Sequence, residues 1–84
     1  MEIAFTPAAW RDWQKLPKQA QTRLRAKLEF YARDPLRYAV KLTDSRVGQY
    51  RFRVGDYRVV FDLAESTSTI AILAVGHRKD IYKG

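Results

Sequence analysis

The chain has 84 residues and a mass of 9.8 kDa, a length that allows one folded domain and excludes two separate hydrophobic cores. Cysteine is absent and histidine occurs once, so disulfides, thiolate catalysis and zinc sites built from cysteine or several histidines are excluded. Sixteen Lys and Arg against nine Asp and Glu give a net charge of +7, which favours an anionic partner such as nucleic acid, an acidic protein or a membrane surface.

The hydropathy of the chain predicts a cytoplasmic location. No stretch approaches the roughly 20 consecutive apolar residues that span a bilayer. Residues 1–5 lack the basic and apolar regions with which a secretory signal begins. We therefore expect a cytoplasmic protein that makes no use of a membrane.

The first part of the chain predicts a short strand and then a helix. Residues 2–5 are typical of a short strand. Thr6 follows as a helix N-cap, and Pro7 takes the first helical position, where its missing N–H has no cost. Apolar residues then recur at helical spacing as far as Leu16.

A second helix is expected after Pro17, which interrupts the first helix or starts the next. Its apolar stripe runs over residues 20–31. The pair Asp34-Pro35 ends this helix, because the residue before a proline is pushed out of the α region. Residues 36–48 show no clear period and predict a loop.

The second half predicts three strands, because the hydrophobic period changes to two. Residues 50–54 alternate between apolar and polar side chains, and apolar side chains stand at every second position from 57 to 63. Between them, Gly55-Asp56 is a two-residue hairpin signal in which the glycine takes the first positive φ of a type II′ turn. Residues 69–75 are apolar on both faces, which favours a central strand.

These elements predict an α+β fold in the order β-α-α-β-β-β. We expect an N-terminal strand and a helical hairpin packed on one face of a mainly antiparallel four-stranded sheet, whose other face is open to solvent or to a ligand. Gly76 is expected to end the last strand, and residues 77–83 to form a short basic C-terminal tail. The whole chain, residues 1–84, is assigned to a single domain.

The register of the hairpin brings three arginines together. With a two-residue loop, Arg53 lies directly opposite Arg58 on the next strand. Because side chains alternate between faces, Arg51 shares the face of these two arginines. Like charges at opposed positions destabilise a sheet by tenths of a kcal/mol to about 1 kcal/mol. An anion between them reverses that effect, and arginine suits phosphate because its planar fork binds two oxygens and stays charged.

Three interpretations of this basic face remain open from the pattern alone. It is a phosphate site for nucleic acid, a solvated surface that keeps the chain soluble, or a docking surface for an acidic protein. Arg78 reaches the same face if the last strand is adjacent to the hairpin.

The C-terminal residues have chemical and structural interpretations. His77 lies at a strand end beside Arg78 and Lys79, where it is a structural residue or an acid–base group, since histidine titrates near neutral pH. Tyr82 stacks on a base, donates a proton, or simply packs against the fold.

Two stretches resemble the RelE/ParE superfamily of toxins. Residues 50–61, YRFRVGDYRVVF, are similar to the central hairpin of that family, and residues 74–82, AVGHRKDIY, resemble the C-terminal motif of its RelE branch. Lys41-Leu42 and the run WRDWQKL at residues 10–16 also fit the family's pattern. The resemblance therefore extends over essentially the whole chain, as a single RelE-like domain.

The resemblance implies a function. RelE-type toxins of type II toxin–antitoxin systems are ribosome-dependent endoribonucleases that cut mRNA in the ribosomal A site and inhibit translation. They use no metal and no other cofactor. The ribose 2′-OH attacks the adjacent phosphate in line, which leaves a 2′,3′-cyclic phosphate and a 5′-OH. A cognate antitoxin neutralises the toxin, and operator DNA is bound only by the toxin–antitoxin complex.

The resemblance also implies roles for individual residues. By position, Arg51 and Arg53 match two basic residues of RelE-like sites, here assigned to substrate binding. Arg58 matches the arginine that grips the scissile phosphate, and Arg78 matches an arginine that stabilises negative charge. Tyr82 matches the tyrosine that stacks on the base and orients the nucleotide.

One departure concerns the residue that transfers the proton. RelE-type sites have a lysine of base character at one of two positions where this chain has Arg51 and Arg53, and arginine is a poor general base. His77 is therefore a further candidate for the catalytic acid or base, and Lys79 is a further candidate for substrate binding.

Two rival functions share the expected fold. A ParE-like chain inhibits DNA gyrase and cuts no RNA, and the spacing of Arg78 and Tyr82 argues for RelE instead. A catalytically inactive toxin-like module acts only with its antitoxin as a repressor of the operon.

Overall fold

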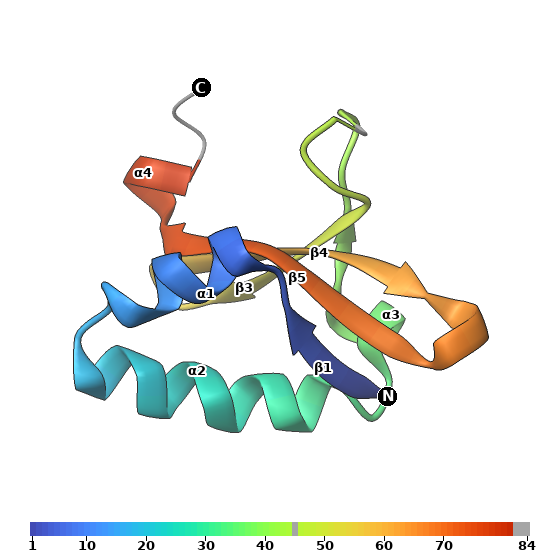
Figure 1. Ribbon diagram of the computed structural model, residues 1–84, viewed down its shortest axis with the longest axis horizontal. Helices are drawn as coiled ribbons and strands as arrows, with labels where there is room; N and C mark the ends of the chain where they lie inside the picture. Colours follow the sequence, from blue (N-terminus) through green and yellow to red (C-terminus); the bar gives the residue numbers. More distant parts are fainter. Residues whose placement is uncertain (45, 82–84) are drawn as a thin grey trace.

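The computed structural model of the chain describes residues 1–44 and 46–81 (Figure 1). Its helices are α1 (Pro7–Gln14), α2 (Lys18–Tyr31), α3 (Pro35–Tyr38) and α4 (Arg78–Ile81). Its strands are β1 (Glu2–Phe5), β2 (Val40–Lys41), β3 (Tyr50–Val54), β4 (Tyr57–Ala64) and β5 (Thr69–His77), with a 3₁₀ turn over Glu65–Thr67.

The strands form one mixed sheet in the order β1-β5-β4-β3-β2. β1 pairs in parallel with β5, and the other neighbours are antiparallel. The α+β class is therefore confirmed, and the apolar β5 has a neighbour on each side as predicted. The expected number of four strands is wrong, because β2 adds a fifth strand at the edge beside β3.

The two long helices, α1 and α2, lie on the same side of the sheet (Figure 1). The core between the helices and the sheet is apolar, and the side chains that α1, α2 and the strands bury in it include Trp13, Leu24, Leu28, Phe52, Val59, Phe61, Ile70 and Ile72. This placement confirms the helical hairpin on one face. The opposite face is flanked by two projections, α4 at one end and the β2–β3 loop at the other (Figure 1).

The helix boundaries follow the predicted signals. The Thr6 hydroxyl accepts a hydrogen bond from the Ala9 amide at 3.1 Å, and Pro7 occupies the first turn of α1. Pro17 stands at the N-terminus of α2 and so separates the two helices. Over residues 1–44 and 46–81, no helix combines the length and the apolar composition needed to cross a membrane.

The segment predicted as a loop, residues 36–48, contains two short elements instead. Pro35 starts the one-turn helix α3, since proline is favoured at a first helical position. The ring of Tyr38 then stacks on that of Tyr31, with centroids 4.7 Å apart. β2 pairs with β3, and the Leu42 amide donates to the Gln49 carbonyl at 2.9 Å. Elements this short depend on tertiary contacts and leave no period in the sequence.

The C-terminal part also departs from the prediction. β5 continues through Gly76, which pairs with Arg58, and ends at His77, which pairs with Tyr57. The pairing of β5 with β4 extends past Gly76 because Tyr57 of β4 pairs with His77. Within the segment predicted as a basic tail, residues 78–81 form the short helix α4, and the Arg78 amide donates to the Asp56 carbonyl at 2.7 Å.

The β2–β3 loop approaches the sheet closely at Gly48. A β-carbon built at Gly48 would lie 2.6 Å from Val60 Cγ1 and 3.0 Å from Leu73 Cδ1, and the φ of +157° is unusual for an L residue. Val60 is fully buried in β4, so it has no free space into which to move. The loop is therefore held over this face of the sheet, and the Gln49 amide donates to Asp62 Oδ1 at 2.8 Å beside it.

We expect Gly48→Ala to lower the free energy of unfolding by about 1–3 kcal/mol, because the added methyl overpacks a rigid site. Gly76→Ala is the matched control: among the described residues other than its chain neighbours, the nearest heavy atom to its β-carbon would be Ile81 Cβ at 4.0 Å. Urea unfolding of both variants tests this. Equal midpoints for the two variants would contradict the close approach of the loop to Val60.

Candidate nucleic-acid interface

The predicted hairpin register is confirmed. Val54 pairs with Tyr57, and Arg53 pairs with Arg58. Gly55 has a φ of +59°, and Asp56 is not among the described residues with positive φ, as a type II′ turn requires. The side chains of Phe52, Val59 and their apolar neighbours enter the core, so the arginines point to the opposite side.

We call this surface the arginine face, defined by Arg51, Arg53 and Arg58. Its members differ in exposure: Arg53 is exposed, Arg51 is half-buried, and Arg58 is only 5% exposed. The face therefore combines an accessible guanidinium on β3 with a deeply set guanidinium on β4. Sequence alternation predicted the shared face and did not reveal this difference in depth.

Arg58 is held by the turn of its own hairpin. Its Nη1 donates to the Gly55 carbonyl at 2.8 Å and to the Tyr57 carbonyl at 2.9 Å. Its Nε is buried and has no hydrogen-bond partner among the residues that the structure describes. A buried donor without a partner costs about 1–3 kcal/mol, and more when it belongs to a charged group. This donor is therefore available to an acceptor that the described residues do not supply.

Helix α4 lies next to the strand position that pairs with Arg58. Gly76 pairs with Arg58, so the two residues are directed to the same face of the sheet. A β-carbon at Gly76 would lie 4.0 Å from Ile81 Cβ of α4. The short helix therefore lies over the arginine face at this point.

Arg78 is attached to the same turn. Its amide donates to the Asp56 carbonyl, and its Nε lies 3.8 Å from Asp56 Oδ1. The two side chains are 53% and 66% exposed, so this ion pair contributes little to stability. It does keep the Arg78 guanidinium beside the turn that also holds Arg58, and an incoming anion can replace the Asp56 carboxylate.

The structure adds two residues that the sequence analysis missed. Asp56 anchors α4 through its backbone and its carboxylate, whereas the sequence identified it only as a turn residue. Arg23 of α2 lies against the same turn, since a β-carbon at Gly55 would be 2.9 Å from Arg23 Nη2. Neither contact follows a local pattern, because each joins segments far apart in the chain.

His77 is not brought to the arginine face. It pairs with Tyr57, whose side chain is on the helix side of the sheet, and the two rings meet edge to face with centroids 5.8 Å apart. Its Nδ1 accepts the Lys79 amide at 3.1 Å at the start of α4. It also lines a pocket of about 310 Å³ together with Asp12 and Asp80. These contacts place His77 between Tyr57 and the start of α4, on the helix side of the sheet.

The other predicted site residues are placed as follows. Lys79 lies exposed on α4, one residue after Arg78. Tyr82 lies outside the described residues, and its role stays a prediction.

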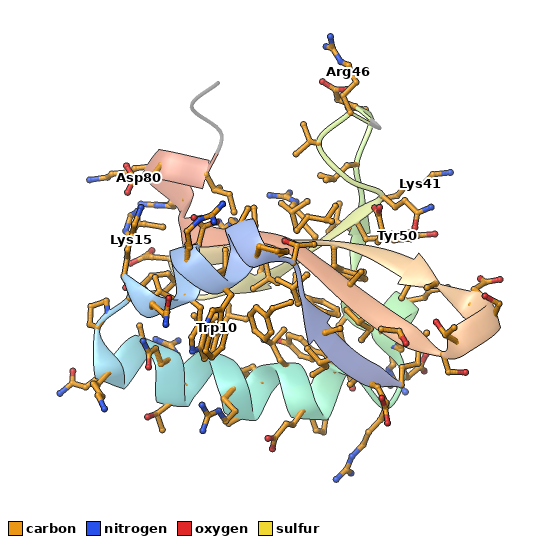
Figure 2. All side chains as sticks on the ribbon, in the orientation of Figure 1. Trp10, Lys15, Lys41, Arg46, Tyr50 and Asp80 are labelled. Atoms are coloured by element: carbon orange, nitrogen blue, oxygen red, sulfur yellow. The ribbon has the colours of Figure 1, made fainter. Side chains whose placement is uncertain are left out.

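The second projection beside the arginine face is the β2–β3 loop, with Arg46 at its tip (Figure 2). The Arg46 guanidinium donates to both carboxylate oxygens of Asp44, at 3.1 and 3.2 Å. These hydrogen bonds, together with one from the Arg46 amide, lower the pKa of Asp44. The charge of Arg46 is thus balanced within the loop, whereas no carboxylate of residues 1–44 and 46–81 forms an ion pair with Arg53.

Comparison with known proteins identifies the family. A family model described as the ParE toxin of the type II toxin-antitoxin system, parDE, matches residues 3–82. The protein Toxin RelG of Mycobacterium tuberculosis is 36% identical over 85 residues, which cover 96% of this chain and 94% of that protein.

Solved structures give the same result. The toxin–antitoxin complex RelBE2 of Mycobacterium tuberculosis contains a chain that is 34% identical, with a TM-score of 0.75 over 92% of this chain and 96% of that one. The RelB–RelE antitoxin–toxin complex of Methanococcus jannaschii gives 25% identity and a TM-score of 0.71 over 94% of each chain. These matches show that the present chain belongs to the RelE/ParE superfamily of type II toxin–antitoxin toxins.

Proposed function

We propose that this chain is a RelE-type endoribonuclease that cuts mRNA in the ribosomal A site, inhibits translation and is neutralised by a cognate antitoxin. The observation that carries the proposal is the buried guanidinium of Arg58, whose Nε has no acceptor in the described part of the chain, close to exposed Arg53 on the paired strand. A phosphodiester supplies the missing acceptor and relieves the repulsion between the two arginines.

In the proposed reaction, the ribose 2′-oxygen forms a bond to the adjacent phosphorus, and the bond from phosphorus to the 5′-oxygen breaks. Arg58 and Arg78 stabilise the negative charge that develops on the phosphate, and Arg51 and Arg53 hold the flanking backbone. Tyr82 stacks on a base, and Lys79 adds a further contact to the substrate. Rate enhancement then comes mainly from charge stabilisation and orientation.

Proton transfer is assigned to water. The 2′-hydroxyl loses its proton to solvent, and the leaving 5′-oxygen gains one from solvent. Arg51 and Arg53 are poor bases because they stay charged, and His77 lies on the other side of the sheet from them. The ribosome fixes the mRNA, so the toxin needs to supply only part of the site.

The first test is primer extension on programmed ribosomes, beside the same mRNA without ribosomes. We expect cleavage only with ribosomes. Arg58→Lys and Arg78→Ala should each lower the cleavage rate by about 10²–10³, the loss seen when one preorganised oxyanion donor is removed. Lysine at position 58 keeps the charge and loses the planar fork.

Arg37→Ala is the matched control for these variants, because it removes one guanidinium from α3, where Arg37 lies 6.0 Å from the Tyr38 ring. It should cleave at the wild-type rate. Thermal unfolding of each variant confirms that it is folded. A folded Arg58→Ala, Arg78→Ala double variant that keeps full activity would remove the proposal.

His77 gives a second prediction. His77→Asn keeps a side-chain acceptor for the Lys79 amide and removes the imidazole, so cleavage should stay within a few-fold of wild type. The pH dependence of the cleavage rate should be the same for both proteins. A loss of about 10²–10⁴, the range of general acid–base catalysis, would instead assign proton transfer to His77.

The ParE-like alternative is retained because the matching family model is described as a ParE toxin. DNA gyrase supercoiling in the presence of the pure protein separates the two functions. Inhibited supercoiling together with intact mRNA would replace the proposal. Growth arrest on expression without an antitoxin argues against an inactive module that serves only in operon repression.

A further inference from the structure

The turn of the arginine hairpin is contacted by an arginine from each side of the sheet. On the arginine face, Arg58 Nη1 donates to the Gly55 carbonyl at 2.8 Å. On the helix side, a β-carbon at Gly55 would lie 2.9 Å from Nη2, 3.2 Å from Cζ and 3.3 Å from Nη1 of Arg23. Because these three distances are similar, the Arg23 guanidinium lies broadside against the turn. Positive charge therefore extends around the end of the hairpin to the helix side.

Arg23 is positioned by packing against the turn and not by an opposite charge. It is exposed on α2, and within residues 1–44 and 46–81 its side chain makes no hydrogen bond and no ion pair. Arg46 and Arg78, in contrast, each face a carboxylate, that of Asp44 and that of Asp56. A guanidinium that is held in place without a carboxylate can offer its planar fork to a phosphate.

A pocket of about 340 Å³ lies beside this guanidinium and is lined by Pro17, Gln19, Ala20, Arg23 and Tyr57. Its volume is about twice that of an engineered cavity of about 150 Å³ that holds benzene, so it has room for one nucleobase. The lining combines an aromatic ring, a side-chain amide and a guanidinium. These groups stack on an unpaired base, form hydrogen bonds with its edge and bind its phosphate.

The neighbouring pocket of about 310 Å³ is less suited to a nucleotide. It shares Tyr57 with the first pocket, but it is lined by the two carboxylates of Asp12 and Asp80 against the single ammonium of Lys15. Carboxylates repel a phosphate. Of the described residues that line the pocket at Arg23, none is acidic, so a nucleotide is better placed there.

The scissile phosphate of the proposed reaction lies on the arginine face, so a nucleotide on the helix side belongs to another part of the RNA. The ribosome supplies such RNA around the A site, in keeping with the proposed dependence of cleavage on ribosomes. We propose that an unstacked nucleotide of ribosomal RNA docks in this pocket. Its base stacks on Tyr57 and is hydrogen-bonded by the Gln19 amide, and its phosphate is bound by Arg23.

This inference rests on the proposed ribosome-dependent function and adds a partner to it. The docked nucleotide would fix the hairpin turn on the ribosome, and the same turn holds Arg58 through the Gly55 carbonyl and Arg78 through Asp56. The N-terminal part of α2 and α4, which carries Arg78, lie at the same end of the molecule (Figure 1). Arg23 is therefore a positioning residue, and its loss should raise KM for ribosomes and leave kcat unchanged.

The test measures binding of the full chain to ribosomes whose mRNA carries a 2′-deoxy nucleotide at the cleavage position, so that the proposed cleavage cannot accompany binding. Arg23→Gln should weaken binding about tenfold. It should also lower the slope of log Kd against log salt concentration by about 0.7–0.9, the value of one phosphate contact.

Arg33→Gln is the matched control for Arg23→Gln, because it removes one exposed guanidinium just beyond the C-terminal end of α2. It should keep the wild-type affinity and salt slope. At position 57, Tyr57→Leu should weaken binding about tenfold because stacking is lost. Tyr57→Phe keeps the aromatic ring and should bind within a few-fold of wild type. Thermal unfolding of each variant confirms that it is folded.

Chemical probing of the ribosomal RNA identifies the docked base. At saturating protein, a base that the wild type protects from dimethyl sulfate or kethoxal should become reactive again with Arg23→Gln and with Tyr57→Leu. Loss of affinity without a change at any ribosomal base would overturn the inference in favour of a contact with an acidic ribosomal protein. Equal effects of Arg23→Gln and Arg33→Gln would also overturn it, because net charge alone would then explain them.

The two proposals fail in different ways. A wild-type chain that cuts mRNA on ribosomes, with wild-type affinity and salt slope in Arg23→Gln, overturns only the docking of ribosomal RNA in the pocket. A wild-type chain that binds ribosomes through Arg23 and leaves all-ribose mRNA intact overturns only the proposed cleavage. Absence of any binding to ribosomes would overturn both.

Discussion

The two-residue turn at Gly55-Asp56 fixes the register of β3 against β4, and that register decides which side chains share a face. One residue of slippage would move every arginine of the hairpin into the core and every apolar side chain out of it. The burial of Phe52 and Val59 opposes such a slip, because both are completely buried against the helices. The hydrophobic core thus holds Arg53 and Arg58 opposite each other, although like charges at that spacing repel.

The same turn organises the elements around the arginine face. It accepts hydrogen bonds from Arg58 through Gly55, and from the start of α4 through Asp56. α4 lies over the face at Gly76, the partner of Arg58, and the β2–β3 loop, held close to the sheet at Gly48, stands at the other end of the face (Figure 1). In the proposed function, a phosphodiester first meets exposed Arg53, and the deeply set guanidinium of Arg58 lies behind it.

The sequence was sufficient for features that local rules determine. Thr6 and Pro7 predict the start of α1, and the alternation around Gly55-Asp56 predicts the hairpin and the face shared by its arginines. The sequence was insufficient where contacts between segments far apart in the chain determine the structure. α3 and β2 have too few residues to show a period, β5 continues through Gly76 because β4 pairs with it, and the helix-side position of His77 follows only from that pairing. The burial of Arg58 also does not follow from the alternation, and α4 was predicted only as part of a tail.

The central claim is that the arginine face promotes cleavage of an mRNA phosphodiester by the 2′-OH of the adjacent ribose of that mRNA. An mRNA with a single 2′-deoxy nucleotide at the cleavage position in the A site tests it most directly, because the substitution removes the nucleophile and leaves every phosphate in place. The account predicts that the ribosome-bound deoxy mRNA stays intact while the all-ribose mRNA is cut to a 2′,3′-cyclic phosphate. Cleavage of both at equal rates would contradict it.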